Sequence, residues 1–267
     1  MRIGALIPIR LASERLPGKA LMPIGGRPAV HHLLERCFAS RHLQPDRVVV
    51  CTTNDRTDDA LVPVVESTGA RVFRGSRDDI IDRFHAAVEA NGFDAVIQVD
   101  GDDPFADTSY MDRCVARLLG DDSLDVVSSA GLPLGLNSKA LRARAISRVR
   151  EHRVTEKNDH GFILFFTATG LCSTAVIRPV SPAHEHATAR VTLDYEDDLR
   201  FFNALYEAIP SMNHPFGVEE IVTALQLRPS LVDINGHLND EYWNRSRALL
   251  HLQYRRDGKV LDVEQQP

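Results

Sequence analysis

Apolar runs alternate with amphipathic segments along the first half of the chain. Between the apolar runs, hydrophobic side chains recur at steps of three and four, which is the spacing of one helix face. The expected strands are residues 3–9, 47–52, 71–73, 95–99 and 125–128, and the expected helices are residues 28–40, 58–68, 79–91 and 108–119. Strands that are apolar on both faces and joined by helices predict a mostly parallel sheet flanked by helices. The pattern therefore indicates an α/β fold, with ligands expected at the carboxyl ends of the strands.

The regular alternation of apolar runs and amphipathic segments ends at about residue 132. Residues 138–150 have helical spacing, and the runs at 162–166 and 171–178 flank Thr169-Gly170, which predicts a hairpin. We expect a small β-rich lobe here, over about residues 150–190. The later expected elements are a strand that ends at Asp194, helices at 196–209 and 217–227, and an amphipathic helix at 240–256 within a helical tail of about 238–267. Residues 1–267 are expected to form a single domain.

Composition argues against several classes of protein. The 267 residues carry a formal net charge of −6, whereas binding to a nucleic-acid backbone needs an excess of Lys and Arg. No apolar run approaches the roughly 18 residues of a membrane span, and the first run is too short for a signal peptide. The four cysteines lie far apart and form neither a zinc nor a disulfide pattern. We therefore expect a cytoplasmic protein without a nucleic-acid or membrane partner.

A cationic loop, "RLASERLPGK", follows the first expected strand at residues 10–19. It contains Arg10, Arg15 and Lys19, with Ser13 as a hydroxyl donor and Gly18 to allow close backbone approach. A bound triphosphate needs such cations, because negative charge must be held and allowed to move. The loop matches neither the G-x-G-x-x-G nor the G-x-x-x-x-G-K-[ST] phosphate motif. The alternative interpretation is a solvated basic loop.

Carboxylates gather at the ends of two apolar runs. The run in "AVIQVDGDDPFAD" ends in Asp100, Asp102 and Asp103, and a later run ends at Asp194. Mg²⁺ prefers oxygen ligands and usually takes one or two protein carboxylates beside substrate phosphates. For each Asp taken alone, the alternative is a helix cap or a turn. The coincidence with the cationic loop favours a metal site, although the sequence leaves open whether Asp102 and Asp194 meet.

Four motifs in order carry a family resemblance. The segment "IPIRLASERLPGKALMPIGGRPAV" resembles the N-terminal signature of the cytidylyltransferases that activate 3-deoxy-manno-octulosonate (Kdo) and sialic acids, within the glycosyltransferase-A-like nucleotidyltransferase fold. The segments "FRGSRDDIIDRFHAA", "VDGDDPF" and "RVTLDYEDDL" resemble later motifs of these enzymes, with the agreement closest to the spore-coat polysaccharide branch. The resemblance covers roughly residues 1–210. It is specific for the fold and for nucleotidyl transfer, and much less specific for the acceptor.

The resemblance implies a role for each matching residue. Arg10, Arg15 and Lys19 act in catalysis by holding the triphosphate, and Asp102 and Asp194 bind Mg²⁺. The residues implied to bind the nucleotide are Pro8, Arg10, Ser13, Lys19, Arg77, Asp79, Arg83 and Asp100. An acceptor oxygen then attacks the α-phosphorus of CTP in line with the departing pyrophosphate, without a protein nucleophile. Related enzymes also imply a homodimer.

Two positions depart from the family pattern. Asp100 stands where Kdo enzymes have glutamine, and Tyr195 stands where threonine is usual. Both changes bear on the identity of the acceptor more than on the nucleotidyl transfer reaction.

A second basic segment, "RVREHRVTEKNDHGF", is the candidate acceptor site. Its Arg150, His152, Arg153 and Lys157 are predicted to bind an anionic acceptor, which is a 3-deoxy or nonulosonic sugar acid or a phosphonate. The alternative is a solvated helix face. A similar R-E-H-x-V-T segment occurs in the spore-coat branch, which favours a function. Because Arg pairs with a carboxylate or a phosphonate through bidentate hydrogen bonds, the segment does not distinguish the two.

Other functions remain as alternatives. A nucleotidyltransferase that uses UTP or GTP with a sugar phosphate usually carries a G-x-G-T-R loop, where this chain has R-L-A-S-E-R. A glycosyltransferase normally shows a D-x-D motif, which Asp100-Gly101-Asp102 matches formally. A catalytically silent binding module on the same fold is the third alternative. The intact cationic loop favours transfer from a triphosphate.

Three further features are expected to be structural. His184-Glu185-His186 lies among prolines, which favours a surface loop over a metal site. The pair His31-His32 is expected at a helix start, in packing and at the surface. The tail helix is expected to dock on the body of the protein or on a second subunit.

Overall fold

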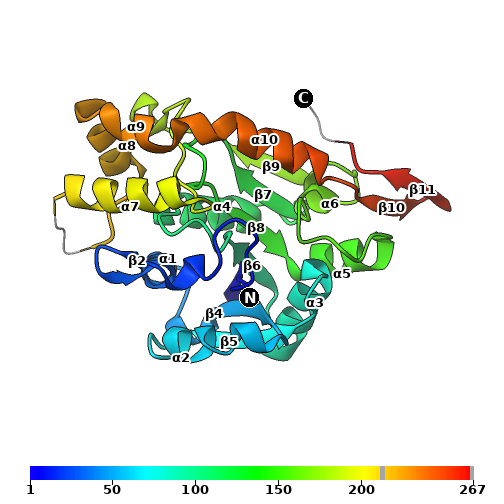
Figure 1. Cartoon of the computed structure of the whole chain (residues 1–267). Coiled ribbons are helices and arrows are strands. Elements are labelled where there is room, and N and C mark those ends of the chain that lie inside the picture. The colour runs from blue at the N-terminus through cyan, green and yellow to red at the C-terminus, as the bar shows by residue number, and fades with distance from the viewer. Residues whose placement is uncertain (211–213, 265–267) are drawn as a thin grey trace.

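A seven-stranded sheet forms the centre of the computed structural model, which describes residues 1–210 and 214–264 (Figure 1). Its strand order is β5-β4-β1-β6-β8-β7-β9. The strands are β1 (Ile3–Pro8), β4 (Val48–Thr53), β5 (Arg71–Gly75), β6 (Ala95–Gln98), β7 (Val126–Ser129), β8 (Lys139–Arg142) and β9 (Thr174–Ile177). Strand β8 is antiparallel to both of its neighbours, and every other pairing in this sheet is parallel. The expected mostly parallel sheet is confirmed.

Helices cover both faces of the sheet because the side chains of each strand alternate between two hydrophobic clusters. On β1, Ala5 and Ile7 face one cluster and Leu6 faces the other. The first cluster is closed by α1 (Ala29–Phe38), α2 (Leu61–Glu66) and α4 (Thr108–Leu119). The second is closed by α3 (Ile80–Asn91), α5 (Ala143–His152) and α6 (Leu164–Thr167). The sheet is thus buried on both sides.

A third hydrophobic cluster packs against the loops that leave the strands. It contains α7 (Glu196–Ala208), α8 (Val218–Leu227) and α9 (Ser230–Asn235). Leu16 of the cationic loop, Phe105 from the loop after β6, and Leu193 beside Asp194 are all buried in it. This cluster therefore fixes three segments that carry candidate site residues.

Two expected elements in the middle of the chain are wrong. Residues 138–150 do not form one helix, because residues 139–142 are strand β8 and only then does α5 begin. Residues 162–166 do not form a strand, because α6 occupies residues 164–167, and β9 joins the main sheet beside β7. The expected hairpin, and with it a separate β-rich lobe, is therefore not found among the described residues.

The end of the chain also differs from expectation. Residues 191–194 form no strand; instead an isolated bridge joins Arg190 to Leu134. Up to residue 264, the tail is helical only in η5 (Gly236–Leu238) and α10 (Asn239–Ala248), after which β10 (Gln253–Arg256) and β11 (Lys259–Asp262) form a hairpin. Figure 1 shows α10 running from α9 towards this hairpin. Residues 265–267 of the expected tail lie outside the described residues. No helix in the described part of the chain is long and apolar enough to cross a membrane.

Candidate active site

A cavity of about 440 Å³ opens at the carboxyl ends of β1 and β6. Four segments supply most of its lining: residues 8–20 with the cationic loop, residues 100–103 after β6, residues 159–164, and residues 242–250 of α10 and its continuation. Ile80, Arg83, Leu134 and Thr192 complete the lining. Its volume lies within the range of small-molecule sites. The position agrees with the expectation for a parallel sheet, whose ligands bind where the strands end.

The cationic loop projects its charges because its apolar residues are anchored. Leu11 is buried and its backbone N–H donates to Asp58 Oδ1 at 2.7 Å, while Leu16 is buried in the third cluster. Gly18 closes the loop with a φ of 74°, the left-handed region that favours glycine, and its N–H donates to the Leu11 carbonyl at 2.8 Å. The remaining polar residues of the loop face the cavity, namely Arg10, Ser13, Glu14, Arg15 and Lys19.

A second glycine lets the two strand ends approach each other. A Cβ atom on Gly101 would lie 2.4 Å from the Pro8 carbonyl oxygen and 2.4 Å from a side-chain atom of Ile9. Any larger residue would push the loop after β6 away from β1. Gly101 therefore sets the spacing between the cationic loop and the aspartates on either side of it, Asp100 and Asp102.

Asp102 and Asp194 meet at a single ammonium group. The Lys19 Nζ donates to Asp102 Oδ2 at 2.8 Å and to Asp194 Oδ1 at 2.9 Å. Backbone contacts hold the two aspartates in register, since the Leu193 N–H donates to the Asp102 carbonyl at 2.7 Å. The two carboxylates lie 92 positions apart in the sequence. The structure thus brings together the two predicted metal ligands and the predicted catalytic lysine.

The Asp194 carboxylate is held in its ionised form by the cations around it. Burial alone would raise its pKa, but Lys19 and Arg15 outweigh burial and lower the pKa to about 2. Arg15 forms an ion pair with Oδ1, and Arg190 donates to Oδ2 at 3.0 Å from the other side. In contrast, burial and the neighbouring Asp102 raise the pKa of Asp103 well above its usual value. Negative charge is therefore concentrated where the cations converge.

The donor set fits a divalent cation. Asp102 Oδ2 and Asp194 Oδ1 both accept from Lys19 Nζ. A cation at the position of this ammonium group is therefore stabilised by both carboxylates. Within the described residues there is no group of three or more His, Cys, Asp or Glu side chains able to hold a metal. Two carboxylates without further protein ligands suit Mg²⁺, which leaves its remaining positions to water and substrate phosphates.

Asp100 has a partner that the sequence did not reveal. Its Oδ2 accepts from Lys139 Nζ at 2.8 Å and its Oδ1 accepts from Gln98 Nε2 at 2.8 Å. Lys139 lies on β8, which the sequence pattern assigned to a helix. Without that strand, no signal in the sequence places Lys139 at the cavity. Asp100 lines the cavity with its charge already paired.

The predicted nucleotide-binding residues divide into two groups. Pro8 and Arg83 line the cavity with the loop residues, and Arg83 is buried with Nη1 donating to the Cys51 carbonyl at 3.1 Å. Asp79 instead caps α3, where its Oδ1 accepts from the Asp82 N–H at 2.9 Å. Arg77 is exposed. Neither Arg77 nor Asp79 is among the described residues that line the cavity.

Three of the four predicted acceptor-binding residues are engaged elsewhere, and the fourth is exposed. Arg153 pairs with Asp79, and Arg150 Nε donates to Asp82 Oδ1 at 2.8 Å. His152 Nδ1 lies 2.9 Å from the Arg148 carbonyl oxygen, and Lys157 is exposed. None of the four belongs to the described lining of the cavity. Their role in acceptor binding stays a prediction.

Two site residues in the C-terminal part of the chain have only weak sequence signals. Arg190 is fully buried and donates to Asp198 Oδ1 at 2.9 Å as well as to Asp194. Tyr242 of α10 places its ring 4.5 Å from the Arg190 guanidinium carbon and 5.7 Å from that of Arg15. Tyr242 lies in the tail segment for which the sequence predicts a docking helix, and Arg190 is the first residue of the quoted motif "RVTLDYEDDL".

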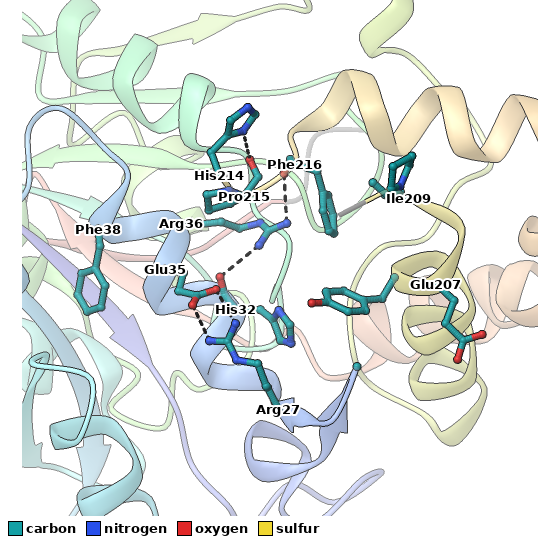
Figure 2. Close-up of a pocket in the computed structure, with 13 residues that line it drawn as sticks. Arg27, His32, Glu35, Arg36, Phe38, Glu207, Ile209, His214, Pro215 and Phe216 are labelled. Atoms are coloured by element: carbon teal, nitrogen blue, oxygen red, sulfur yellow. Dashed lines mark hydrogen bonds and ion pairs between the residues drawn. The ribbon is translucent and has the colours of Figure 1, made fainter. Parts of the chain in front are cut away.

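A larger cavity of about 690 Å³ lies apart from the aspartates, between α1, the end of α7 and residues 214–216 (Figure 2). Arg36 is buried there between the rings of Phe105 and Phe216, at 4.7 and 4.6 Å from their centroids. It donates to the carbonyl oxygens of His32 and Phe216. These contacts fasten the loop before α8 to α1, so we assign this cavity no part in the chemistry.

His32, which lines this larger cavity, is expected to make the free energy of unfolding depend on pH. Its Nε2 lies 2.8 Å from the Ile24 carbonyl oxygen, yet burial lowers its pKa from 6.5 to about 4. Between these two pH values His32 is protonated in the unfolded state and neutral in the folded state. The free energy of unfolding therefore falls as the pH drops from 6.5 to about 4. We expect His32 to remove about 3 kcal/mol of stability between pH 7 and pH 4.

Urea unfolding at the two pH values measures this loss. Glutamine keeps an amide donor at position 32 but does not titrate, so His32→Gln should lose about 3 kcal/mol less than the wild type over the same interval. The exposed His251 provides the control, because His251→Gln should follow the wild type. Equal losses in the wild type and His32→Gln would contradict the prediction.

The other histidine motif is structural in the described part of the chain. His184 Nδ1 lies 2.9 Å from the Tyr110 hydroxyl, and Pro182–His184 form a short 3₁₀ turn. This agrees with the expected surface loop.

Comparison with known proteins identifies one relative that matches most of the chain and another that matches less than half of it. The sequence model of the family described as "Cytidylyltransferase" matches residues 4–169. The spore coat polysaccharide biosynthesis protein SpsF of Bacillus subtilis is 28% identical over 227 residues, which are 84% of this chain and 94% of that protein. The 3-deoxy-manno-octulosonate cytidylyltransferase of Geobacter sulfurreducens is 38% identical over 120 residues, which are 44% of this chain and 46% of that protein.

A solved structure supports the same fold. The cytidylyltransferase from Leptospira borgpetersenii serovar Hardjo-bovis superposes with a TM-score of 0.77 at 21% sequence identity, and the alignment covers 87% of this chain and 97% of that one. The expected nucleotidyltransferase fold is confirmed.

Proposed function

Because this chain belongs to the cytidylyltransferase family, we propose that it transfers CMP from CTP to an anionic acceptor and releases pyrophosphate. The observation that carries the proposal is the meeting of Lys19 with Asp102 and Asp194 in one cavity beside Arg10 and Arg15. Cations and carboxylates at one point suit a reaction in which a triphosphate and a metal ion must be held together.

The cationic loop holds the triphosphate in this proposal. Arg10 is paired with Asp159 at 2.8 Å and Arg15 with Asp194, so both guanidinium groups are positioned before substrate enters. They orient the β- and γ-phosphates, and Ser13 adds a hydroxyl to the same wall. Lys19 turns from the aspartates to the phosphate oxygens and stabilises the charge that develops on departing pyrophosphate. Positioning and electrostatics supply the rate, and no protein nucleophile is required.

Mg²⁺ is the proposed cofactor. Asp102 and Asp194 would hold it, and when bound it would neutralise charge on the α-phosphate. The low pKa of Asp194 keeps this carboxylate ionised and ready to bind a cation. Arg190 keeps the Asp194 carboxylate in place from the side away from Lys19.

Pro8, Arg83 and Asp100 are proposed to border the nucleotide, because they line the cavity next to the loop. The proposed acceptor is a 3-deoxy or nonulosonic sugar acid or a phosphonate. The relatives include a spore coat polysaccharide biosynthesis protein and a Kdo cytidylyltransferase, which favours the sugar acid. The homodimer and the cytoplasmic location stay predictions.

Calorimetry with nucleoside triphosphates tests the proposal. CTP with Mg²⁺ is expected to bind the purified protein at least about ten-fold more tightly than UTP, ATP or GTP. Asp102→Asn removes half of the carboxylate pair, so it should abolish the Mg²⁺-dependent part of the binding. The control is Asp46→Asn, at an exposed aspartate far from the cavity lining. If no triphosphate binds, or a nucleoside diphosphate sugar binds better than CTP, the chain is a glycosyltransferase or a silent binding module instead.

A further inference from the structure

The helix α10 lies over the cavity without packing against the core. Within its ten residues, all of which the structure describes, no side chain is buried. Tyr242, Arg245, Ser246 and Leu249 nevertheless line the cavity, at the i, i+3, i+4, i+7 spacing of one helix face. A helix whose inner face borders a cavity gains its packing from whatever fills that cavity. α10 lies outside residues 4–169, the part matched by the family model.

Both ends of α10 are fixed. Before it, Leu238 is buried, and Asn239 Nδ2 donates to the Thr188 carbonyl at 3.2 Å. After it, Leu252 and Tyr254 are buried in the second cluster, and Tyr254 bridges to Arg153. The helix is therefore held across the opening as a defined wall, and its inner side chains have fixed positions relative to the loop.

Two polar groups on the inner face lack a full set of partners. Arg245 forms one ion pair, with the exposed Glu14, and its buried Nε has no hydrogen-bond partner among the described residues. The Tyr242 ring lies across Arg190 and Arg15, and within the described chain its hydroxyl makes no hydrogen bond. Burial, Asp102 and Asp194 raise the pKa of Tyr242, so the hydroxyl keeps its proton and remains a donor.

We propose that α10 is the acceptor-facing wall of the cavity, where Arg245 and the Tyr242 hydroxyl bind the carboxylate of a polyhydroxylated sugar acid. This inference rests on the proposed function, which assigns Arg10 and Lys19 of the cationic loop to the triphosphate; α10 touches that loop through Arg245 and Glu14. Ser246 adds a hydroxyl for a sugar hydroxyl group. α10, which lies outside the residues matched by the family model, would thus take part in selecting the acceptor.

The charges favour a carboxylate over a phosphonate. An incoming carboxylate takes the place of the Glu14 carboxylate on Arg245, and Glu14, whose side chain is 66% exposed, returns to water. This exchange leaves the charge around Arg245 unchanged. A phosphonate dianion would add a second negative charge close to Asp102 and Asp194, which repel it.

Trp243 makes the test direct, because it is the single tryptophan of the chain and lies on α10 beside Tyr242. The full-length protein is first saturated with Mg²⁺ and α,β-methylene CTP, which cannot transfer CMP. It is then titrated with 3-deoxy-manno-octulosonate, N-acetylneuraminate or 2-aminoethylphosphonate. Binding is followed by calorimetry and by Trp243 fluorescence. We expect a sugar acid to bind more tightly than the phosphonate and to change the Trp243 emission.

Variants separate the acceptor wall from the nucleotide wall. Arg245→Gln should weaken binding of the sugar acid at least about ten-fold and Tyr242→Phe about five-fold, with the affinity for the CTP analogue changed less than about three-fold. Arg247→Gln is the matched control on the outer face of α10, where Arg247 contacts Asn244, and it should bind both ligands like the wild type.

The outcomes distinguish this inference from the function on which it rests. If the wild type does not bind the CTP analogue, the proposed function fails. If it binds the analogue but no sugar acid, or binds the phosphonate more tightly, the assigned acceptor class is wrong. If Arg245→Gln weakens the CTP analogue as much as the acid, or Trp243 does not respond to a bound acid, α10 is not the acceptor wall.

Discussion

Replacing Lys19 with methionine is expected to lower kcat/KM for CMP transfer about 10³-fold. Lys19 contacts both Asp102 and Asp194, so the substitution removes the cation proposed to stabilise the leaving pyrophosphate and leaves two carboxylates facing each other. Methionine keeps much of the length and bulk of the side chain, which limits the effect on packing. Pyrophosphate release measured with CTP, Mg²⁺ and a fixed acceptor reports the loss.

The exposed Lys259 on β11 offers a matched control, since Lys259→Met removes a positive charge far from the cavity lining. This variant should retain wild-type activity. A second measurement separates binding from chemistry. Without the ammonium, Asp102 and Asp194 should bind Mn²⁺ in the absence of nucleotide more tightly than they do in the wild type, as seen by calorimetry. Activity of Lys19→Met within ten-fold of the wild type would show that Lys19 has no role in transfer.

Replacing Arg190 with methionine is expected to destabilise the fold by about 3–5 kcal/mol. Arg190 is fully buried and pairs with two carboxylates, those of Asp194 and Asp198, which are themselves buried. Removing the guanidinium leaves Asp198 without its charged partner. Asp198 still accepts from the backbone N–H groups of Asp194 and Tyr195 at 2.8 and 2.9 Å. These hydrogen bonds limit the loss, but they do not replace a buried positive charge.

Urea unfolding of the apoprotein measures this destabilisation. Arg200→Met is the control, because Arg200 is 71% exposed and pairs with Asp197 at the surface, where an ion pair contributes about 0–1 kcal/mol. Adding Asp198→Asn to Arg190→Met should recover part of the stability, since the second change removes the unpaired charge. A loss below 1 kcal/mol in Arg190→Met would mean that the cluster is not a buried ion-pair network.

The sheet was predictable because its strands are apolar on both faces, and periodicity detects that. Strand β8 was not, because Lys139–Arg142 precede a helix and mix charged residues with helix formers. This segment is a strand because β6 and β7 pair with it on both sides, which is tertiary context that a local pattern does not contain. The same holds for residues 162–166, where Phe165 and Phe166 are buried in α6 and Phe162 in the turn before it, in the cluster that also contains residues of α3 and α5.

The residues of the candidate site also divide into those that a local sequence pattern reveals and those that tertiary contacts bring to the cavity. Arg10, Arg15, Lys19 and Asp102 were found because they follow β1 and β6 directly, and strand ends of a parallel sheet meet at one edge. The basic segment at residues 148–162 stays a prediction as an acceptor site, because counting cations in the sequence does not reveal their partners. Arg150 and Arg153 are paired with Asp82 and Asp79 on α3 and at its cap, so they join two helices. α10 lines the cavity together with segments that lie far from it in the sequence. The spacing of residues along the sequence does not reveal such a contact.

The cavity wall supplied by α10 also has a consequence for synthesis of the protein. Residues 242–250, which line the cavity together with the loop of residues 10–19, are made more than 220 positions after that loop. A nascent chain can form β1, β4, β5 and β6 and even place Lys19 beside Asp102 while the pocket still stands open to water. Arg190, Asp194 and α10 are translated after these strands. The cavity wall is therefore complete only after residue 250 has been made.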